Sequence, residues 1–253
     1  MTALSLVLPA YREAERIGPA LDELFAYLVT AGGLPHPIEV LVINDGSSDT
    51  TADLVRARPE AAGALPGISL AVLTVPHGGK GAAVRAGMLA ASGDLIVFAD
   101  ADMATPPDQF PLLVAALDDH DLALGSRIQP DGSDMRATQP RYRRLLGKAF
   151  HVLASIWVVG PVEDTQCGFK GFSRAAARDL FARQRITSVV FDVELVYLAR
   201  QRGYRVAIVP IRWFDVRGSR MRPGARLALQ VAWDLFRIPL IHRGIRRSST
   251  GPK

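Results

Sequence analysis

Short apolar runs rich in β-branched residues alternate with longer amphipathic runs through the first half of the chain. The amphipathic runs have helical spacing or helix-start residues, as in Ile17–Leu28 and Ser48–Arg58. Alternation of strands and helices predicts an α/β fold with a mostly parallel central sheet and helices on both faces. Five apolar runs have the length and composition of buried strands: Leu4–Leu8, Ile38–Ile43, Ser69–Val75, Asp94–Phe98 and Asp121–Leu124.

The second half of the chain is less regular. We expect a loop over Ile128–Tyr142, a helix over Val190–Gln201, a strand over Arg205–Trp213 and an amphipathic helix over Ala225–Ile241. One interpretation of Gln166–Phe172 is a turn whose Phe169 and Phe172 enter the core. The expected division is a domain over residues 1–224, with halves 1–127 and 128–224, followed by a basic amphipathic helix and tail over 225–253.

Polar residues follow each of the five predicted strands. In parallel sheets, ligands bind beyond the carboxyl ends of the strands, so these residues are expected to line one site. A scaffold also needs turns there, but it does not need carboxylates, Lys and Arg together. The segments are Pro9–Glu13, Asn44–Asp49, Pro76–Gly81, Ala99–Asp102 and Gly125–Arg127.

Asp100 and Asp102 are the central candidates, because two carboxylates at a strand end suit Mg²⁺ or Mn²⁺ bridging a nucleotide diphosphate. An Asp-x-Asp triplet alone also occurs in exposed turns. Asp45 either accepts a hydrogen bond from a nucleobase or caps the following helix. Lys80 lies in a glycine-rich loop that allows close approach of phosphate. Because Gly81 stands where a Walker loop needs Ser or Thr, that loop is excluded.

Composition and charge limit the partners. The single cysteine, Cys167, excludes an internal disulfide and is expected to be buried, and we expect neither a signal peptide nor a membrane-spanning helix. The net charge of +5 is uneven: Arg217–Lys253 holds nine Lys or Arg and one acid. A basic end indicates an anionic partner, unless it is only solvated. Nucleic acid is not expected, because no aromatic-interleaved basic platform is present.

Four motifs in order, PAYREAE, NDGSSD, GGKGAAVRAG and FADADMATP, resemble the inverting family-2 glycosyltransferases of the GT-A fold. This resemblance implies a nucleotide-sugar donor and Mg²⁺ or Mn²⁺. It places Asp45 on the base and Lys80 near base and phosphate. Asp100 and Asp102 would frame the sugar diphosphate and the metal, with Ala101 between them. The remaining residues implied to line the nucleotide are Pro9, Ala10, Tyr11 and Glu13.

The later motifs DTQCGFK and FDVEL, with Trp213 and the Gly218–Arg220 triplet, are similar to polyprenyl-phosphate (dolichyl-phosphate) glucosyltransferases. That likeness implies transfer of glucose from UDP-glucose to a lipid phosphate. From its composition and segments the chain is expected to be cytoplasmic and held peripherally at the inner face of the membrane. The alternatives are GDP-mannose as donor, a hydroxyl acceptor, or a nucleotide-sugar-binding protein without catalysis.

A phosphate acceptor is already anionic near neutral pH, so it needs cations rather than a strong base. Asp192 is either a base for a hydroxyl acceptor or an orienting residue. Lys170 and Gln166 are alternatively ordinary surface residues. The candidate acceptor-binding residues are Arg127, Gln166, Lys170, Ser219 and Arg220.

Two segments fit shallow docking on an anionic membrane: the acid-free stretch Met135–Val162 and the helix Ala225–Ile241. The alternative is that Leu229, Trp233 and Phe236 pack on the body of the protein or form a contact in a homo-oligomer.

Overall fold

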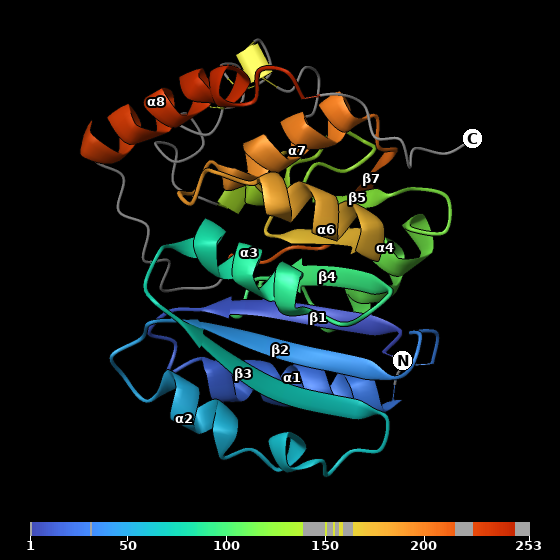
Figure 1. Ribbon diagram of the computed structural model, residues 1–253. Coiled ribbons are helices and arrows are strands. Elements are labelled where there is room, and N and C mark those ends of the chain that lie inside the picture. The colour runs from blue at the N-terminus through green and yellow to red at the C-terminus, as the bar shows by residue number, and fades with distance from the viewer. Residues whose placement is uncertain are drawn as a thin grey trace.

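The computed structural model describes residues 2–30, 32–138, 150, 154, 157–158, 164–215 and 225–245. In this part of the chain, seven strands form one sheet in the order β3-β2-β1-β4-β6-β5-β7 (Figure 1). All neighbouring strands are parallel except β6, which runs antiparallel to both β4 and β5. The strands are β1 (Leu4–Ala10), β2 (Ile38–Asp45), β3 (Ile68–Val75), β4 (Leu95–Ala99), β5 (Leu122–Ser126), β6 (Phe169–Ser173) and β7 (Val206–Pro210).

Helices cover both faces of the sheet, as the alternating pattern predicts (Figure 1). Short 3-10 turns occur at Pro59–Ala62, Pro107–Gln109 and Met135–Thr138. The helices are α1 (Ile17–Thr30), α2 (Thr51–Arg56), α3 (Lys80–Ala90), α4 (Phe110–Ala116), α6 (Arg174–Arg183), α7 (Phe191–Arg202) and α8 (Ala225–Ile241).

Two hydrophobic cores result, one on each face. Leu21 of α1 and Leu113 of α4 pack in the first core. In the second core, Leu195 of α7 and Ile238 of α8 pack beside the side chains of α3 and α6. Burial of a Leu or Ile side chain contributes about 1.5–3 kcal/mol, so α8 is held to the body by apolar contact as well as by polar contacts described below.

The predicted strands of the first half are all present, and the helices predicted over 190–201 and 225–241 are confirmed. The predicted helix over 48–58 is shorter and begins at Thr51, because the Asp49 carboxylate accepts from the backbone N–H and hydroxyl of Thr51 just ahead of it. The predicted strand over 205–213 ends at Pro210. Of the loop predicted over 128–142, residues 139–142 lie outside the described part.

The interpretation of Gln166–Phe172 as a turn is wrong from residue 169 onward, because residues 169–173 form strand β6; a turn is present only at residues 165–166. Alternation decides which face each side chain meets. Phe169 packs in the core beneath α1 and α4, whereas Phe172 packs in the opposite core with α6 and α7, so both are buried as expected. Lys170 shares the face of Phe172, which directs its side chain towards α7.

Candidate functional site

The candidate site lies at the carboxyl edge of the parallel strands. β1 to β4 are mutually parallel, and β5 runs in the same direction because β6 is antiparallel to both β4 and β5. Asp45, Asp100 and Arg127 therefore come to the same edge. The antiparallel β6 adds a second source of residues, because Phe169, its first residue, pairs with Ala99, the last residue of β4. The segment just before β6 therefore reaches the edge where Asp100 lies.

The loop after β1 is fastened to the loop after β2. The backbone N–H of Arg12 donates to Ser47 Oγ at 2.9 Å, and that of Glu13 donates to Thr51 Oγ1 at 2.8 Å. Glu13 also forms a two-pronged ion pair with Arg16, both contacts at 2.6 Å. Arg12 adopts a positive φ of 54°, which is uncommon for a residue other than glycine and is typical of turns at functional sites.

Asp45 is buried and holds the loop before α3. Its two oxygens accept from the backbone N–H groups of Gly78 at 2.8 Å and Gly79 at 3.0 Å. His77 Nδ1 lies 2.9 Å from the same carboxylate, and the His77 ring stacks on Tyr11 with centroids 4.3 Å apart. The structure therefore gives Asp45 a loop-holding role. The alternative that it caps the following helix is wrong, because α2 has no side-chain cap hydrogen bond. Contact with a nucleobase stays a prediction.

Asp100 and Asp102 lie in the turn after β4. Lys80 Nζ, at the start of α3, is 2.5 Å from Asp100 Oδ1, so the loop held by Asp45 delivers a cation to the carboxylate pair. Burial and the neighbouring Asp100 raise the pKa of the Asp102 carboxyl above its ordinary value. Burial alone would lower the pKa of Lys80, but the charges of Asp100 and Asp192 outweigh it and raise that pKa.

The carboxylates of Asp100 and Asp102 fit two of the ligands that a divalent cation needs. Two crowded carboxylates are relieved by positive charge, and oxygen ligands suit Mg²⁺ or Mn²⁺. Within the described residues no group of three or more His, Cys, Asp or Glu side chains is arranged to hold a metal. A metal held by Asp100 and Asp102 would therefore need further ligands from phosphate or water.

Gly168 makes room for Asp100. A Cβ atom placed on residue 168 would lie 2.2 Å from Asp100 Oδ2 and 2.6 Å from Asp100 Cγ, so any larger residue would displace the carboxylate. Its two neighbours, Cys167 and Phe169, are buried, with Cys167 confirmed as a core residue. Close approach of backbone to a functional group is one of the reasons that a glycine is required at a site.

A second ion pair lies deeper, where Lys170 of β6 meets Asp192 of α7. Lys170 Nζ is 2.6 Å from Asp192 Oδ1, also donates to the Cys167 carbonyl oxygen, and lies 5.4 Å from the centre of the Phe98 ring. Lys170 is completely buried, so the interpretation of this residue as a surface lysine is wrong. Burial raises the pKa of the Asp192 carboxyl, and the charges of Lys170 and Lys80 oppose that rise.

Arg127 forms the third ion pair of the edge. Its guanidinium binds both oxygens of Asp164, at 2.8 and 2.6 Å, and its backbone N–H donates to the same carboxylate at 2.9 Å. Burial alone would raise the pKa of Asp164, but the hydrogen bonds and charge of Arg127 hold it below its ordinary value. The guanidinium also lies 5.6 Å from the centre of the Trp213 ring, which is partly buried.

Of the other predicted acceptor residues, the structure describes Gln166 but not Ser219 or Arg220. The Gln166 side-chain amide donates to the Val189 carbonyl at 3.2 Å, so one of its two N–H donors is already bonded. Ser219 and Arg220 lie outside the described residues. The roles of Arg127, Gln166 and Lys170 at an acceptor stay predictions.

Three residues of this edge had no role in the prediction. Asp164 forms an ion pair with Arg127, and Gly168 leaves space for the Asp100 carboxylate. Glu194 of α7 is fully buried, and both of its carboxylate oxygens accept hydrogen bonds from backbone N–H groups. A signal existed for Glu194, which stands between the core residues Val193 and Leu195. Asp164 follows Glu163 and precedes Thr165, so its immediate neighbours give no such signal. The need for glycine at 168 depends on the register of β6, which the sequence does not reveal.

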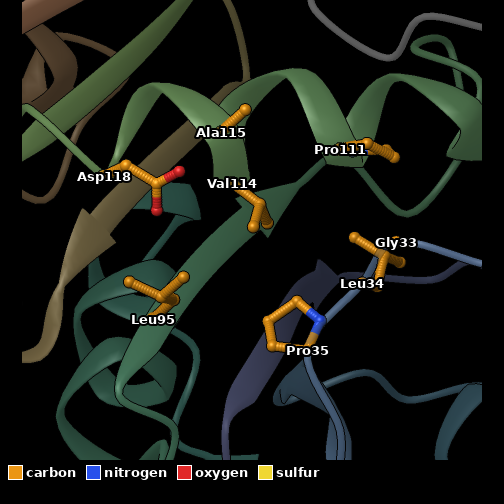
Figure 2. A pocket seen from close by; sticks show the side chains of 8 residues that line it. All are labelled: Gly33, Leu34, Pro35, Leu95, Pro111, Val114, Ala115 and Asp118. Carbon is orange, nitrogen blue, oxygen red and sulfur yellow. The ribbon is translucent and has the colours of Figure 1, made fainter.

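Figure 2 shows an apolar pocket at the opposite edge of the sheet. Leu95 begins β4, and Leu34 and Asp118 precede β2 and β5, so the pocket lies at the amino ends of the parallel strands. Its single carboxylate, Asp118, faces no cation among the lining residues. The candidate site is therefore the polar edge rather than this pocket.

Comparison with known proteins shows the family to which the chain belongs. The sequence matches glycosyl transferase family 2 over residues 5–181, more than half of the chain. A dolichyl-phosphate beta-glucosyltransferase of Trichomonas vaginalis is 38% identical over 94% of this chain and 71% of its own length. The dolichyl-phosphate beta-glucosyltransferase of Drosophila melanogaster is also 38% identical, over 93% of this chain and 74% of its own length.

Solved structures share the fold. Glucosyl-3-phosphoglycerate synthase from Mycobacterium tuberculosis in complex with UDP aligns with a TM-score of 0.64 at 23% identity, covering 99% of this chain and 83% of that one. The same enzyme in complex with Mn²⁺, UDP and glucosyl-3-phosphoglycerate aligns with a TM-score of 0.61 at 24% identity over 99% and 83%. The expected GT-A architecture is confirmed, and the chain is a glycosyltransferase that belongs to glycosyl transferase family 2.

Proposed function

We propose that this chain transfers glucose from UDP-glucose to a polyprenyl phosphate, with inversion at the anomeric carbon. One observation carries the proposal: the carboxylate best placed to act as a base is held by an ammonium group. Lys170 Nζ lies 2.6 Å from buried Asp192, so an acceptor that needs no base suits this site. The names of the relatives, dolichyl-phosphate beta-glucosyltransferases, support the same acceptor class.

On the donor side, the loops after β1, β2 and β3 would hold the nucleotide. Pro9, Ala10 and Tyr11 would line it, with Asp45 at the base and Lys80 at the diphosphate. Ala101 and Glu13 belong to the same predicted lining. Because Lys80 is partly exposed at the start of α3, its charge is available to a phosphate group that approaches Asp100.

Asp100 and Asp102 would hold Mg²⁺ or Mn²⁺, which when bound would neutralise negative charge on the departing diphosphate. Support comes from the mutual crowding of the two carboxylates and from the Mn²⁺ and UDP bound by the Mycobacterium tuberculosis synthase. Lys80 adds a protein-borne positive charge on the same side.

In the proposed reaction, a phosphate oxygen of the acceptor forms a bond to the anomeric carbon while the bond from that carbon to the UDP oxygen breaks. UDP leaves with the electron pair. A phosphate monoester is dianionic at neutral pH, with a second pKa of about 6, so no proton has to be removed. We therefore assign Asp192 an orienting role. Arg127, Lys170 and Gln166 are the described candidates for balancing the acceptor's charge, and Ser219 and Arg220 remain candidates outside the described residues.

A lipid acceptor needs a protein face that reaches the membrane, and α8 provides one. Leu229 and Trp233 are 73% and 60% exposed, Phe236 is largely exposed, and the exposed Trp157 ring stacks on Phe236 with centroids 5.9 Å apart. The high exposure of Leu229 and Trp233 favours membrane contact over the alternative that they pack on the body of the protein, whereas Phe236 does contact Trp157. Among the described residues, no helix combines the length and the hydrophobicity needed to cross a membrane. We propose shallow contact of this aromatic face with anionic lipid at the inner face of the membrane.

The central experiment incubates purified protein with Mn²⁺ or Mg²⁺, UDP-glucose or GDP-mannose, and a short polyprenyl phosphate or a free polyprenol. The expected product is a glucosylated lipid phosphate formed from UDP-glucose. Product from GDP-mannose alone would change the donor, and product on the polyprenol alone would remove the phosphate acceptor. Asp102→Asn should abolish turnover. Asp94→Asn, at the opposite end of β4 and paired with exposed Arg174, is the matched control that should retain it.

Flotation with vesicles tests the membrane contact separately. The wild type should float with vesicles that contain anionic lipid, and Leu229→Glu should float less. Leu112→Glu, an equally apolar exposed position on α4, is the control that should behave as the wild type. A protein that stays at the bottom of the gradient with both neutral and anionic vesicles contradicts the contact. Size-exclusion chromatography of the same variants would show whether the face instead joins two copies.

A further inference from the structure

The segment Gln184–Val190 lies against the start of α3, next to Lys80. The Gly81 N–H donates to the Thr187 carbonyl at 3.0 Å, and the Gln184 side-chain amide donates to the Gly81 carbonyl at 2.9 Å. The fit is close, because a Cβ on Gly81 would lie 2.8 Å from the Thr187 oxygen. Movement of this segment would therefore move the backbone that carries Lys80.

Glu194 of α7 holds the same segment from the other side. Its two oxygens accept from the backbone N–H groups of Arg185 and Ile186, both at 2.8 Å. The Glu194 side chain is fully buried, so these hydrogen bonds are shielded from water. Charge-assisted bonds to backbone N–H groups are short and directional, which makes the carboxylate a rigid anchor for the segment.

Helix α8 and the residue that follows it also contact Glu194 and the Gln184–Val190 segment. His242 Nε2, just past the helix, is 2.6 Å from Glu194 Oε1, and His242 is buried. Ser188 Oγ in the segment donates to Asp234 Oδ2 of α8 at 2.7 Å, and Asp234 is also buried. Figure 1 shows α8 lying beside α7 at the end of the molecule away from α1 and α2. The segment is thus held between α3 on one side and α7 with α8 on the other.

We propose that Glu194 is a positioning residue of the donor site. It fixes the Gln184–Val190 segment, which fixes Gly81 and so the place of Lys80 against the donor diphosphate. His242 extends this support to α8. The proposal rests on the proposed role of Lys80 at the diphosphate, and it gives α8 a part in donor binding that is separate from membrane contact.

The test compares Glu194→Gln, His242→Ala and a control, Glu39→Gln, by UDP affinity, thermal midpoint and steady-state kinetics. Gln at 194 keeps one acceptor oxygen but presents an NH₂ group to the other backbone N–H, so one of the two anchoring hydrogen bonds is lost. Glu39 is a partly buried carboxylate at the opposite edge of the sheet, and one of its oxygens accepts from both Ser5 Oγ at 2.5 Å and the Ser92 N–H at 2.9 Å.

Glu194→Gln should weaken UDP binding about tenfold, raise the KM for UDP-glucose, and leave the KM for the lipid phosphate unchanged. His242→Ala leaves both backbone hydrogen bonds of Glu194 in place, so this variant should fold. It should weaken UDP binding by a smaller factor than Glu194→Gln. Glu39→Gln should lower the thermal midpoint without changing UDP affinity.

Unchanged UDP affinity in folded Glu194→Gln, or in His242→Ala if the first variant does not fold, would overturn the proposal. Equal weakening in Glu39→Gln at an equal loss of thermal midpoint would overturn it as well, because general destabilisation would then explain the effect. A wild-type protein that binds no UDP would instead contradict the proposed function.

Discussion

Substitution of Gly168 by alanine should displace Asp100 with little harm to the fold. The added Cβ would lie 2.2 Å from Asp100 Oδ2, whereas ordinary contact begins at 3.4 Å, so the carboxylate must retreat by about 1.2 Å. The carboxylate has room to move because the Asp100 side chain is 38% exposed. A misplacement of about 1 Å at a reacting centre costs about 100-fold in rate. We therefore expect kcat/KM for UDP-glucose to fall about 100-fold, which corresponds to about 2.7 kcal/mol of transition-state stabilisation.

The assay measures kcat/KM together with the affinity for Mn²⁺ in the presence of UDP, both of which should decrease. Gly18→Ala is the matched control: no atom lies within 4 Å of a Cβ placed there, so activity should be unchanged. A Gly168→Ala protein with wild-type kcat/KM would refute the reasoning, because Asp100 would then tolerate displacement or play no part in the reaction.

Two further predictions concern buried groups of the same edge. Asp164→Asn should lower the free energy of unfolding by about 3 kcal/mol at neutral pH, because Arg127 would stay buried without its charged partner. Since the pKa of Asp164 is lower in the folded protein than in the unfolded chain, its contribution is complete above an unfolded pKa of about 3.9 and is lost as pH falls through the folded pKa. Urea unfolding between pH 6 and 3 should therefore show a shallower acid loss in the variant than in the wild type, and parallel curves would contradict the pairing. Burial raises the pKa of the Cys167 thiol to about 11, so a thiol reagent at pH 8 should label it only after denaturation; labelling of the native protein would show that residue 167 is accessible.

The sequence predicts most of the sheet because its strands have simple patterns. The apolar runs that become β1, β2 and β4 are nearly continuous, as expected for parallel strands buried on both faces. The same rule brings Asp45 and Asp100 to one edge, because the ends of parallel strands coincide. Candidate residues at strand ends therefore follow from the order of apolar runs along the chain.

β6 could not be predicted in the same way. Its sequence, FKGFS, contains a lysine and a glycine, and both normally weaken a strand assignment. Lys170 is tolerated because Asp192, on a helix further along the chain, neutralises it, and this partner is known only from tertiary structure. Gly171 fits because Leu117 and Val97 pack closely over it. These are long-range conditions that no local pattern reports.

On the acceptor side, the sequence also does not predict the ion-pair partners of the candidate cations. Arg127 and Lys170 are candidates because of their charge, yet each has a buried carboxylate partner in the structure. A cation's partner is decided by which elements pack together, and α7 meets β6 only in the folded chain. The sequence therefore predicts that basic side chains lie at this edge, but it does not predict which carboxylates they pair with.

The antiparallel strand β6 also has a consequence for how the protein is made. Among the described strands, β5 has two neighbours in the sheet, β6 and β7, and both follow it in the sequence. During synthesis on the ribosome, β5 emerges before either partner, and β4 lacks its neighbour on one edge until residues 169–173 arrive. Unpaired strand edges attract other chains, so this interval is when the nascent protein is most exposed to misassociation. We expect chaperone contact with the nascent chain to be concentrated between the appearance of β5 and the completion of β6.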